Sequence, residues 1–238
     1  SVGPLNLKQD ERLCAIALVK RLFPLLPTKK QQDVIDWVPG GDGFKMVSWP
    51  SVSYIAAVPW LKQLETTTTA EQRLAYDTDV RALLGSGHHG ETDTRLFGLG
   101  AEDMFKLDGH LYHADGITTW PDDQIKGEDK NGARAKLGQA LKLLRAGSKS
   151  KPTEFYALLK MDGDRIGAKM NAGEAAVNKV KTGLAAFTHS VKAYFDPKEG
   201  NPSSGALIYA GGDDVLALLP LDTALEAAQA RAQAQYLG

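Results

Sequence analysis

Two clusters of acidic residues each follow an apolar run of this chain. Asp162 and Asp164 follow the run YALLKM at 156–161, and Asp213 and Asp214 follow the run ALIYAGG at 206–212. Carboxylates are suitable ligands for Mg²⁺, which is usually bound through one or two carboxylates plus substrate phosphates. Two such ions can stabilise both the attacking and the leaving oxygen of an in-line phosphoryl displacement. The pattern therefore indicates a metal-assisted phosphoryl-transfer site at Asp162, Asp213 and Asp214.

These acids can act together only if the fold brings the two clusters to one place. The pattern predicts a strand at 155–161, a long helix, a hairpin around Gly211–Asp214 and an alanine-rich helix at 221–236. This β-α-β-β-α order gives five of the six elements of a ferredoxin-like βαββαβ unit. In that unit the first strand lies beside the hairpin, so both acidic tips share one edge of the sheet.

The residues around the acids suit a nucleotide. Gly211 and Gly212 can adopt positive φ in the hairpin and allow a nucleotide to approach the backbone. Amides that open the following helix could cradle phosphates, and Arg165 and Lys169 could neutralise them. We expect Asp162, Asp213 and Asp214 to be the metal-binding and catalytic residues. The expected nucleotide-binding residues are Gly163, Asp164, Arg165, Gly167, Lys169, Gly211 and Gly212.

Each motif taken alone has a second interpretation. Gly-Gly-Asp-Asp is an acceptable hairpin turn, and Asp-Gly-Asp is often a helix cap or a surface turn. Two such motifs on neighbouring strand tips favour a site, because aligned carboxylates repel each other unless cations compensate them.

The predicted fold class is α+β. Residues 1–150 form a mainly helical section, in which Ser51 caps a helix that Pro59 interrupts. Residues 151–238 form the ferredoxin-like section, which ends before its last strand, and the Gly/Ser/Lys/Pro stretch 147–152 is the predicted linker. In the helix after the first strand, one buried stripe is expected: Val177, Val180, Leu184, Phe187, Val191 and Tyr194.

Composition narrows the class of protein. With 43% hydrophobic and 24% charged residues, the 238-residue chain has the profile of a soluble globular protein. The formal net charge of −1 argues against binding nucleic acid through bulk positive charge. Cys14 is the only cysteine, so a cytoplasmic, reducing setting is expected. No apolar run is long enough to span a membrane. The absence of an initial Met suggests part of a longer protein.

Two further features have alternative explanations. The segment 126–151 has a net charge of +6 and could contact RNA phosphates, although a solvated helix face fits it as well. His88 and His89, with Glu91 and Asp93, could bind a metal, but their glycine-rich context favours a mobile loop.

The two acidic motifs, YALLKMDGDRIG and YAGGDDVLALLP, resemble those of the large signature subunit of type III CRISPR effector complexes, particularly the III-B (Cmr) branch. Residues 11–23 and 49–57 also resemble that subunit. The resemblance implies a palm domain, similar to those of polymerases and diguanylate cyclases, that converts ATP to cyclic oligoadenylates when target RNA binds. It further implies Mg²⁺ or Mn²⁺ at Asp162, Asp213 and Asp214. The implied partners are other subunits, which also supply most contacts to CRISPR RNA and target RNA.

The sequence departs from that family in several respects. It contains no His-Asp dipeptide of an HD nuclease, no four-cysteine zinc site, no second ferredoxin-like half and no terminal helical domain. DNA cleavage is therefore not expected. One alternative is a catalytically silent scaffold subunit that binds nucleotide. A diguanylate cyclase-like signalling enzyme is a weaker alternative, because Val215 stands where a GGDEF signature has Phe.

Overall fold

The computed structural model describes residues 50–85, 94–163, 166, 170–171, 173–196 and 205–229. The chain divides into two compact units, Ser1–Val47 and Ser48–Gly238, and all described residues lie in the second. The helix expected at 10–23 and the histidine-containing segment 88–93 lie outside the described residues.

The first part of this unit is helical, and a small sheet follows it. The α-helices are α3 (Val52–Thr67), α4 (Ala70–Leu83), α5 (Ala114–Thr118) and α6 (Lys130–Ser148). The 3₁₀ helices are η3 (Thr94–Phe97), η4 (Asp103–Lys106), η5 (Gly109–Tyr112) and η6 (Asp122–Gln124). Then come β1 (Ala157–Met161), α8 (Glu174–Phe195), β2 (Ala206–Gly211) and β3 (Asp214–Leu219), and residues 224–229 are helical. The predicted mixture of helix and sheet is confirmed.

Helix α3 is central to the helical core. Its predicted N-cap is confirmed, because the Ser51 hydroxyl accepts a hydrogen bond from the Tyr54 amide at 3.1 Å. The predicted interruption at Pro59 is wrong, since the helix continues through it. An interior proline costs about 3 kcal/mol. Ile55, Val58 and Leu61 are fully buried, and such side chains each contribute about 1.5–3 kcal/mol, which outweighs that cost.

Buried polar groups hold the irregular segments onto the helices. The hydroxyls of Tyr54 and Tyr112 donate to the carbonyls of Phe105 and Met104, at 2.5 and 2.6 Å. The buried Arg73 of α4 forms a two-point ion pair with Glu102, with both N–O distances 2.7 Å. The two tyrosine bonds satisfy backbone carbonyls of η4, and the ion pair holds the residue before η4 to α4.

The predicted linker at 147–152 is fixed to α3. The Trp60 indole donates to the Ser148 hydroxyl at 3.1 Å and to the Ser150 carbonyl at 3.2 Å. The Ser150 hydroxyl in turn donates to the Gln63 side chain at 2.7 Å. The entry to β1 is therefore held by the helical part, and a domain boundary at residue 150 stays a prediction.

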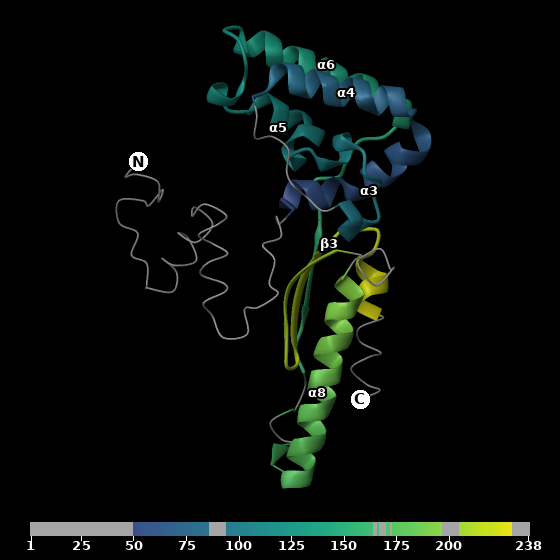
Figure 1. Ribbon diagram of the computed structural model, residues 1–238, viewed down its shortest axis with the longest axis vertical. Helices are drawn as coiled ribbons and strands as arrows, with labels where there is room; N and C mark the ends of the chain where they lie inside the picture. The colour runs from purple at the N-terminus through teal and green to yellow at the C-terminus, as the bar shows by residue number, and fades with distance from the viewer. Residues whose placement is uncertain are drawn as a thin grey trace, which may run out of the picture. The chain divides into compact units, whose positions relative to one another are not determined.

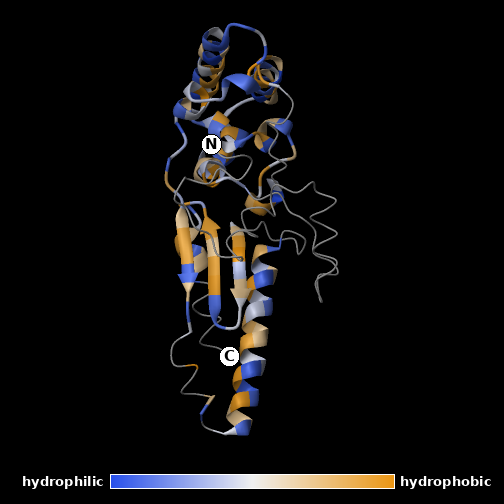
Figure 2. Ribbon diagram, turned by 90° about the vertical axis from the view of Figure 1, so that its left-hand side faces the viewer, coloured by the Kyte–Doolittle hydropathy of each residue, from blue (hydrophilic) through white to orange (hydrophobic). Residues whose placement is uncertain are grey.

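The sheet has the order β1-β3-β2, and both pairs are antiparallel. Helix α8 lies along one face (Figure 1) and contributes Phe187, Val191 and Phe195 to a core shared with β3. On the opposite face, Ala206 and Leu218 pack against the helical core. Hydrophobic residues dominate all three strands (Figure 2).

The predicted stripe on α8 is buried only in part. Phe187 and Val191 are buried, whereas Val177, Val180 and Leu184 are only half-buried. Periodicity identified the correct helix face, but the described sheet covers only its C-terminal half.

Candidate functional site

The strand register brings the two acidic tips to one edge of the sheet. Met161, the last residue of β1, pairs with Val215 of β3, and Gly211 of β2 pairs with Asp214. Asp162 therefore follows β1 at the edge where the β2–β3 turn lies. The predicted placement of both motifs at neighbouring strand ends agrees with this geometry.

One close approach between the two tips involves a glycine. A Cβ atom placed on Gly163 would lie 2.5 Å from Cβ and 2.9 Å from Oδ2 of Asp213. Only a residue without a side chain allows the backbone after β1 to approach the turn so closely. The contact fixes Asp213 beside the chain that carries Asp162.

Gly212 and Asp213 form the two-residue turn between β2 and β3. Gly212 has φ +65°, and the described non-glycine residues with positive φ do not include Asp213. A type II′ hairpin turn requires this combination, with glycine at its first central position. From α8, the Thr188 hydroxyl donates to the Gly212 carbonyl at 3.3 Å. The helix therefore helps to hold the turn that presents the acids.

Tyr209 also lies at this edge, and sequence reasoning did not assign it to the site. Its hydroxyl occupies the space above Gly211, where an added Cβ would lie only 2.5 Å from that oxygen. The Tyr209 side chain is 53% exposed. The signal was available, since residues two apart on a strand share a face. A nucleotide that approaches Gly211 has to displace the Tyr209 ring or stack on it.

The donor atoms at the edge are of the right chemical type for a divalent cation. Asp162 and Asp214 are exposed and Asp213 is half-buried. Among the residues that the structure describes, no three His, Cys, Asp or Glu side chains are grouped closely enough to hold a metal ion. One or two carboxylates suffice where substrate phosphates complete the magnesium sphere, so the donor set fits a metal bound together with a nucleotide.

Four residues expected to bind nucleotide lie outside the described residues. They are Asp164, Arg165, Gly167 and Lys169. Of the expected set, the structure places Gly163, Gly211 and Gly212 beside the acids. Their roles towards a nucleotide stay predictions.

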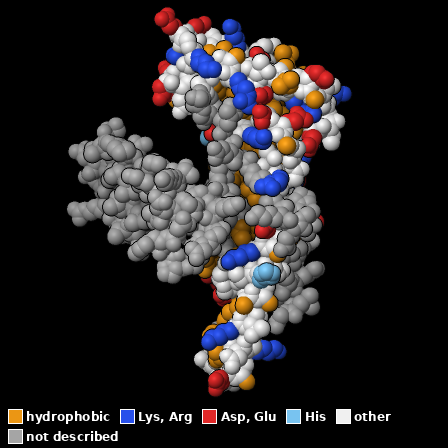
Figure 3. Space-filling model, viewed as in Figure 1, with side chains coloured by type: hydrophobic (Ala, Val, Ile, Leu, Met, Phe, Trp, Pro, Cys, Tyr) orange, Lys and Arg blue, Asp and Glu red, His pale blue; other side chains and the backbone are white. Residues whose placement is uncertain are grey.

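The basic segment 126–151 is partly used within the fold. Lys126 and Lys130 donate to the carbonyls of Arg81 and Ile125, both at 2.6 Å, and Arg134 pairs with Asp122. On the face shown in Figure 3, Lys and Arg side chains are interspersed with Asp and Glu over the helical part. These contacts favour the interpretation as a helix face over an extended RNA-binding surface.

No helix among the described residues is long and apolar enough to cross a membrane.

Comparisons with known proteins find a match that covers both acidic motifs. Residues 155–236, which include both acidic motifs, match the family model of the second palm domain of Cas10/Cmr2. The chain is also 27% identical over 248 aligned positions to the CRISPR system Cmr subunit Cmr2 of Pyrococcus furiosus. That alignment covers 92% of this chain but only 25% of the relative, so the chain spans about a quarter of its length. The resemblance inferred from the two acidic motifs is thus confirmed: the chain is similar to a Cmr2 subunit of the CRISPR system, and residues 155–236 are similar to the second palm domain of Cas10/Cmr2.

Proposed function

We propose that this chain supplies a palm that binds ATP and joins ATP molecules into cyclic oligoadenylates within a type III CRISPR effector complex. The observation that carries the proposal is the juxtaposition of Asp162 with the Gly212-Asp213 turn at one edge of the sheet. In the reaction, a ribose 3′-OH attacks the α-phosphate of a second ATP. A 3′–5′ phosphodiester forms, the bond between the α- and β-phosphates breaks, and pyrophosphate leaves.

Three carboxylates have the main roles. Asp162, Asp213 and Asp214 would hold Mg²⁺ or Mn²⁺ together with the phosphates of ATP. When bound, these cations supply charge neutralisation at the attacking and leaving oxygens. Gly163 keeps the two carboxylate-bearing segments in contact, and Gly212 provides the turn that orients Asp213 and Asp214.

The sheet order supports a ferredoxin-like palm. In the split βαβ arrangement, the second strand of the hairpin that follows the helix lies between the first strand and the first strand of the hairpin. The observed order β1-β3-β2, with α8 between β1 and β2 along the chain, is compatible with this arrangement. Within the described residues β1 pairs only with β3, so a fourth strand would add at the other edge of β1.

The proposed setting is a cytoplasmic complex of several subunits. The named relative is a Cmr subunit. Partner subunits would provide most contacts to CRISPR RNA and target RNA, since this chain has a formal net charge of only −1.

A silent scaffold that binds nucleotide without turnover is the second candidate. It is favoured by the lack of a three-residue metal-binding group among the described side chains. ATP binding that depends on Asp213 and Asp214, without release of pyrophosphate, would identify this function.

The test uses the complete effector complex with target RNA, ATP and Mg²⁺, and it measures pyrophosphate release. Asp213→Ala/Asp214→Ala should abolish the release. A matched control is Asp123→Ala/Glu128→Ala, which removes two exposed acids from the helical part. Release that persists in the Asp213/Asp214 variant would overturn the site, and loss in both variants would show a general effect of charge.

A further inference from the structure

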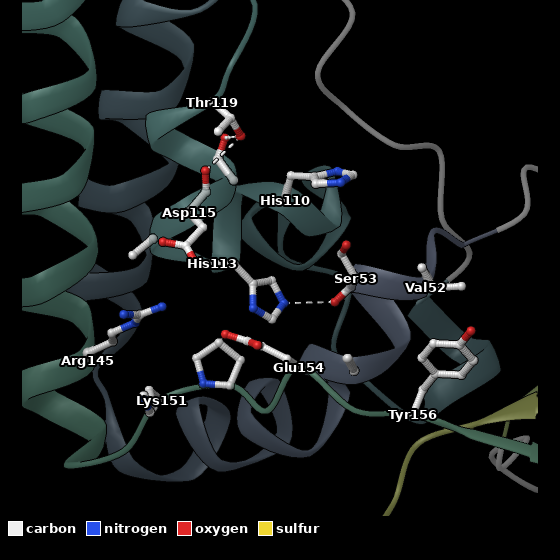
Figure 4. A pocket seen from close by; sticks show the side chains of 14 residues that line it. Val52, Ser53, His110, His113, Asp115, Thr119, Arg145, Lys151, Glu154 and Tyr156 are labelled. Atoms are coloured by element: carbon white, nitrogen blue, oxygen red, sulfur yellow. Dashed lines mark hydrogen bonds between the residues drawn. The ribbon is translucent and has the colours of Figure 1, made fainter.

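A cavity of about 450 Å³ lies at the opposite end of β1 from the acidic tips. Its walls come from the start of α3, the η5–α5 segment, the end of α6 and residues 151–156, which lead into β1 (Figure 4). The five residues of β1 separate it from Asp162, which corresponds to about 17 Å of extended chain. It is therefore a different site from the palm edge.

Arg145 of α6 is the most informative residue of this cavity. Its Nη2 donates to the Tyr112 carbonyl at 2.9 Å, while its buried Nε has no hydrogen-bond partner. In the part of the chain that the structure describes, no carboxylate lies within ion-pair distance of this guanidinium. Burial lowers the pKa of Arg145. Nη1 also has no hydrogen bond to the described residues, and unlike Nε it is not fully buried, so a ligand can reach it. A partly desolvated cation with unused donors is costly unless an acceptor completes it, which indicates an anionic ligand.

The other charged side chains of the cavity limit the charge of that ligand. Lys151 adds a second cation, whereas Asp115 and Glu154 add two acids. No ion pair joins Arg145, Lys151, Asp115 or Glu154 to another residue of the described chain. Because the lining charges balance, a triphosphate or an RNA strand would meet strong repulsion from the two acids. A single phosphate group is compatible with this balance.

The remaining walls can accept hydrogen bonds and cover a flat apolar group. Nε2 of His113 lies 3.0 Å from the Ser53 carbonyl, and burial lowers the pKa of His113, which favours the neutral ring. A neutral ring that donates from Nε2 leaves Nδ1 as an acceptor. Tyr156 and Val52, both partly exposed, lie on the side away from Arg145 and Lys151 (Figure 4).

We propose that this cavity binds a nucleoside monophosphate. The phosphate lies at Arg145 and Lys151, the base lies against Tyr156 and Val52, and ribose hydroxyl or base amino groups donate to Glu154, Asp115 and His113. The volume is within the range of about 300–1,000 Å³ that is usual for small-molecule sites. A bound nucleotide would tie residues 151–156, and so the entry to β1, to α3 and α6.

The test is titration of the full chain with AMP by calorimetry, with UMP and inorganic phosphate as comparisons. Arg145→Gln and Lys151→Gln should each weaken AMP binding about tenfold, the expected effect of losing one charge-assisted hydrogen bond. The matched control is Lys142→Gln, an exposed lysine of α6 that does not line the cavity, and it should leave binding unchanged. Because Arg145 also holds the Tyr112 carbonyl, Lys151→Gln decides the test if Arg145→Gln fails to fold.

Several results would overturn the proposal. They are no AMP binding, equal weakening by Lys142→Gln, or equal affinity for inorganic phosphate. Binding of a short single-stranded RNA with the same residue dependence, but not of AMP, would assign the cavity to RNA instead. Asp213→Ala/Asp214→Ala should leave AMP binding intact. Loss of AMP binding in that variant would place the nucleotide at the palm edge.

Discussion

The contact between Gly163 and Asp213 can be tested with a single methyl group. Gly163→Ala places a Cβ atom 2.5 Å from the Asp213 Cβ, closer than real Cβ contacts allow. The nearest atom is at the base of the Asp213 side chain, so it moves only if the turn itself moves. We therefore expect Gly163→Ala to destabilise the fold and to displace Asp213.

The expected loss of stability in Gly163→Ala follows from two opposing effects. Overpacking in a closely packed region costs about 1–3 kcal/mol. Replacing glycine also restricts the unfolded chain, which stabilises the fold by about 0.4–1 kcal/mol. We expect the free-energy cost of overpacking to exceed the stabilisation from the restricted unfolded chain. For a domain of this size, each 1 kcal/mol lost lowers Tm by about 2–4 °C.

A double-mutant cycle isolates the contact. Asp213→Ala retains the Cβ atom, so Gly163→Ala should remain destabilising in that background. Asp213→Gly removes the atom at 2.5 Å, and Gly163→Ala should then become neutral or stabilising. The free energy of unfolding of all variants is measured by urea denaturation of the full chain, followed by circular dichroism.

The reasoning is refuted if Gly163→Ala has the same effect in all three backgrounds. That result would mean that the segment after β1 and the β2–β3 turn do not touch. Both the juxtaposed acids and the proposed metal site would then lose their structural basis.

Three further predictions concern other positions and use the same denaturation measurement. Gly212→Ala should lower the free energy of unfolding by about 1–2 kcal/mol, because Gly212 has φ +65°. Gly127→Ala is the control, since Gly127 has φ +75° and also lies in open space, and it should have the same effect. A much smaller loss at Gly212 than at Gly127 would contradict the turn geometry. Gly138→Ala, in open space on α6, should stabilise by about 0.5–1 kcal/mol, and destabilisation would show a neighbour there. Hydrogen bonds from Arg73 lower the pKa of Glu102 below its ordinary value of 4.5. The ion pair therefore stabilises the fold fully above pH 4.5, and this stabilisation is lost as the pH falls through the lowered pKa. Glu102→Gln should therefore reduce the loss of stability on acidification, and an unchanged pH profile would count against the ion pair.

The acidic edge was predictable because its signals are local. An apolar run followed by acids indicates a strand tip, and glycines beside acids indicate a hairpin turn. The N-cap at Ser51 follows from an equally local preference of serine. Only the pairing of the two tips required a topology, and the β-α-β-β order suggested one.

Other features depend on packing between distant residues and could not be predicted. Pro59 lies inside α3 because the buried residues around it outweigh its local effect. The approach of Gly163 to Asp213, and of the Tyr209 hydroxyl to Gly211, depends on distances that the sequence pattern does not contain. The hydrogen bond from the Arg145 guanidinium to the Tyr112 carbonyl forms only when α6 and η5 are brought together.

The two ends of the sheet are held in different ways, and this difference bears on how the site works. At the helical end, Ala206 and Leu218 belong to the core of the helical part, and Ser148 and Ser150 bind Trp60. At the acidic end, the contacts of the turn include a close approach to Gly163 and one hydrogen bond from Thr188, and the nearest buried residue is Val215 of β3. Segments with few buried contacts open more easily than those in a core. If metal and nucleotide bind there as proposed, the turn can therefore adjust to them while the helical end keeps the strands in register.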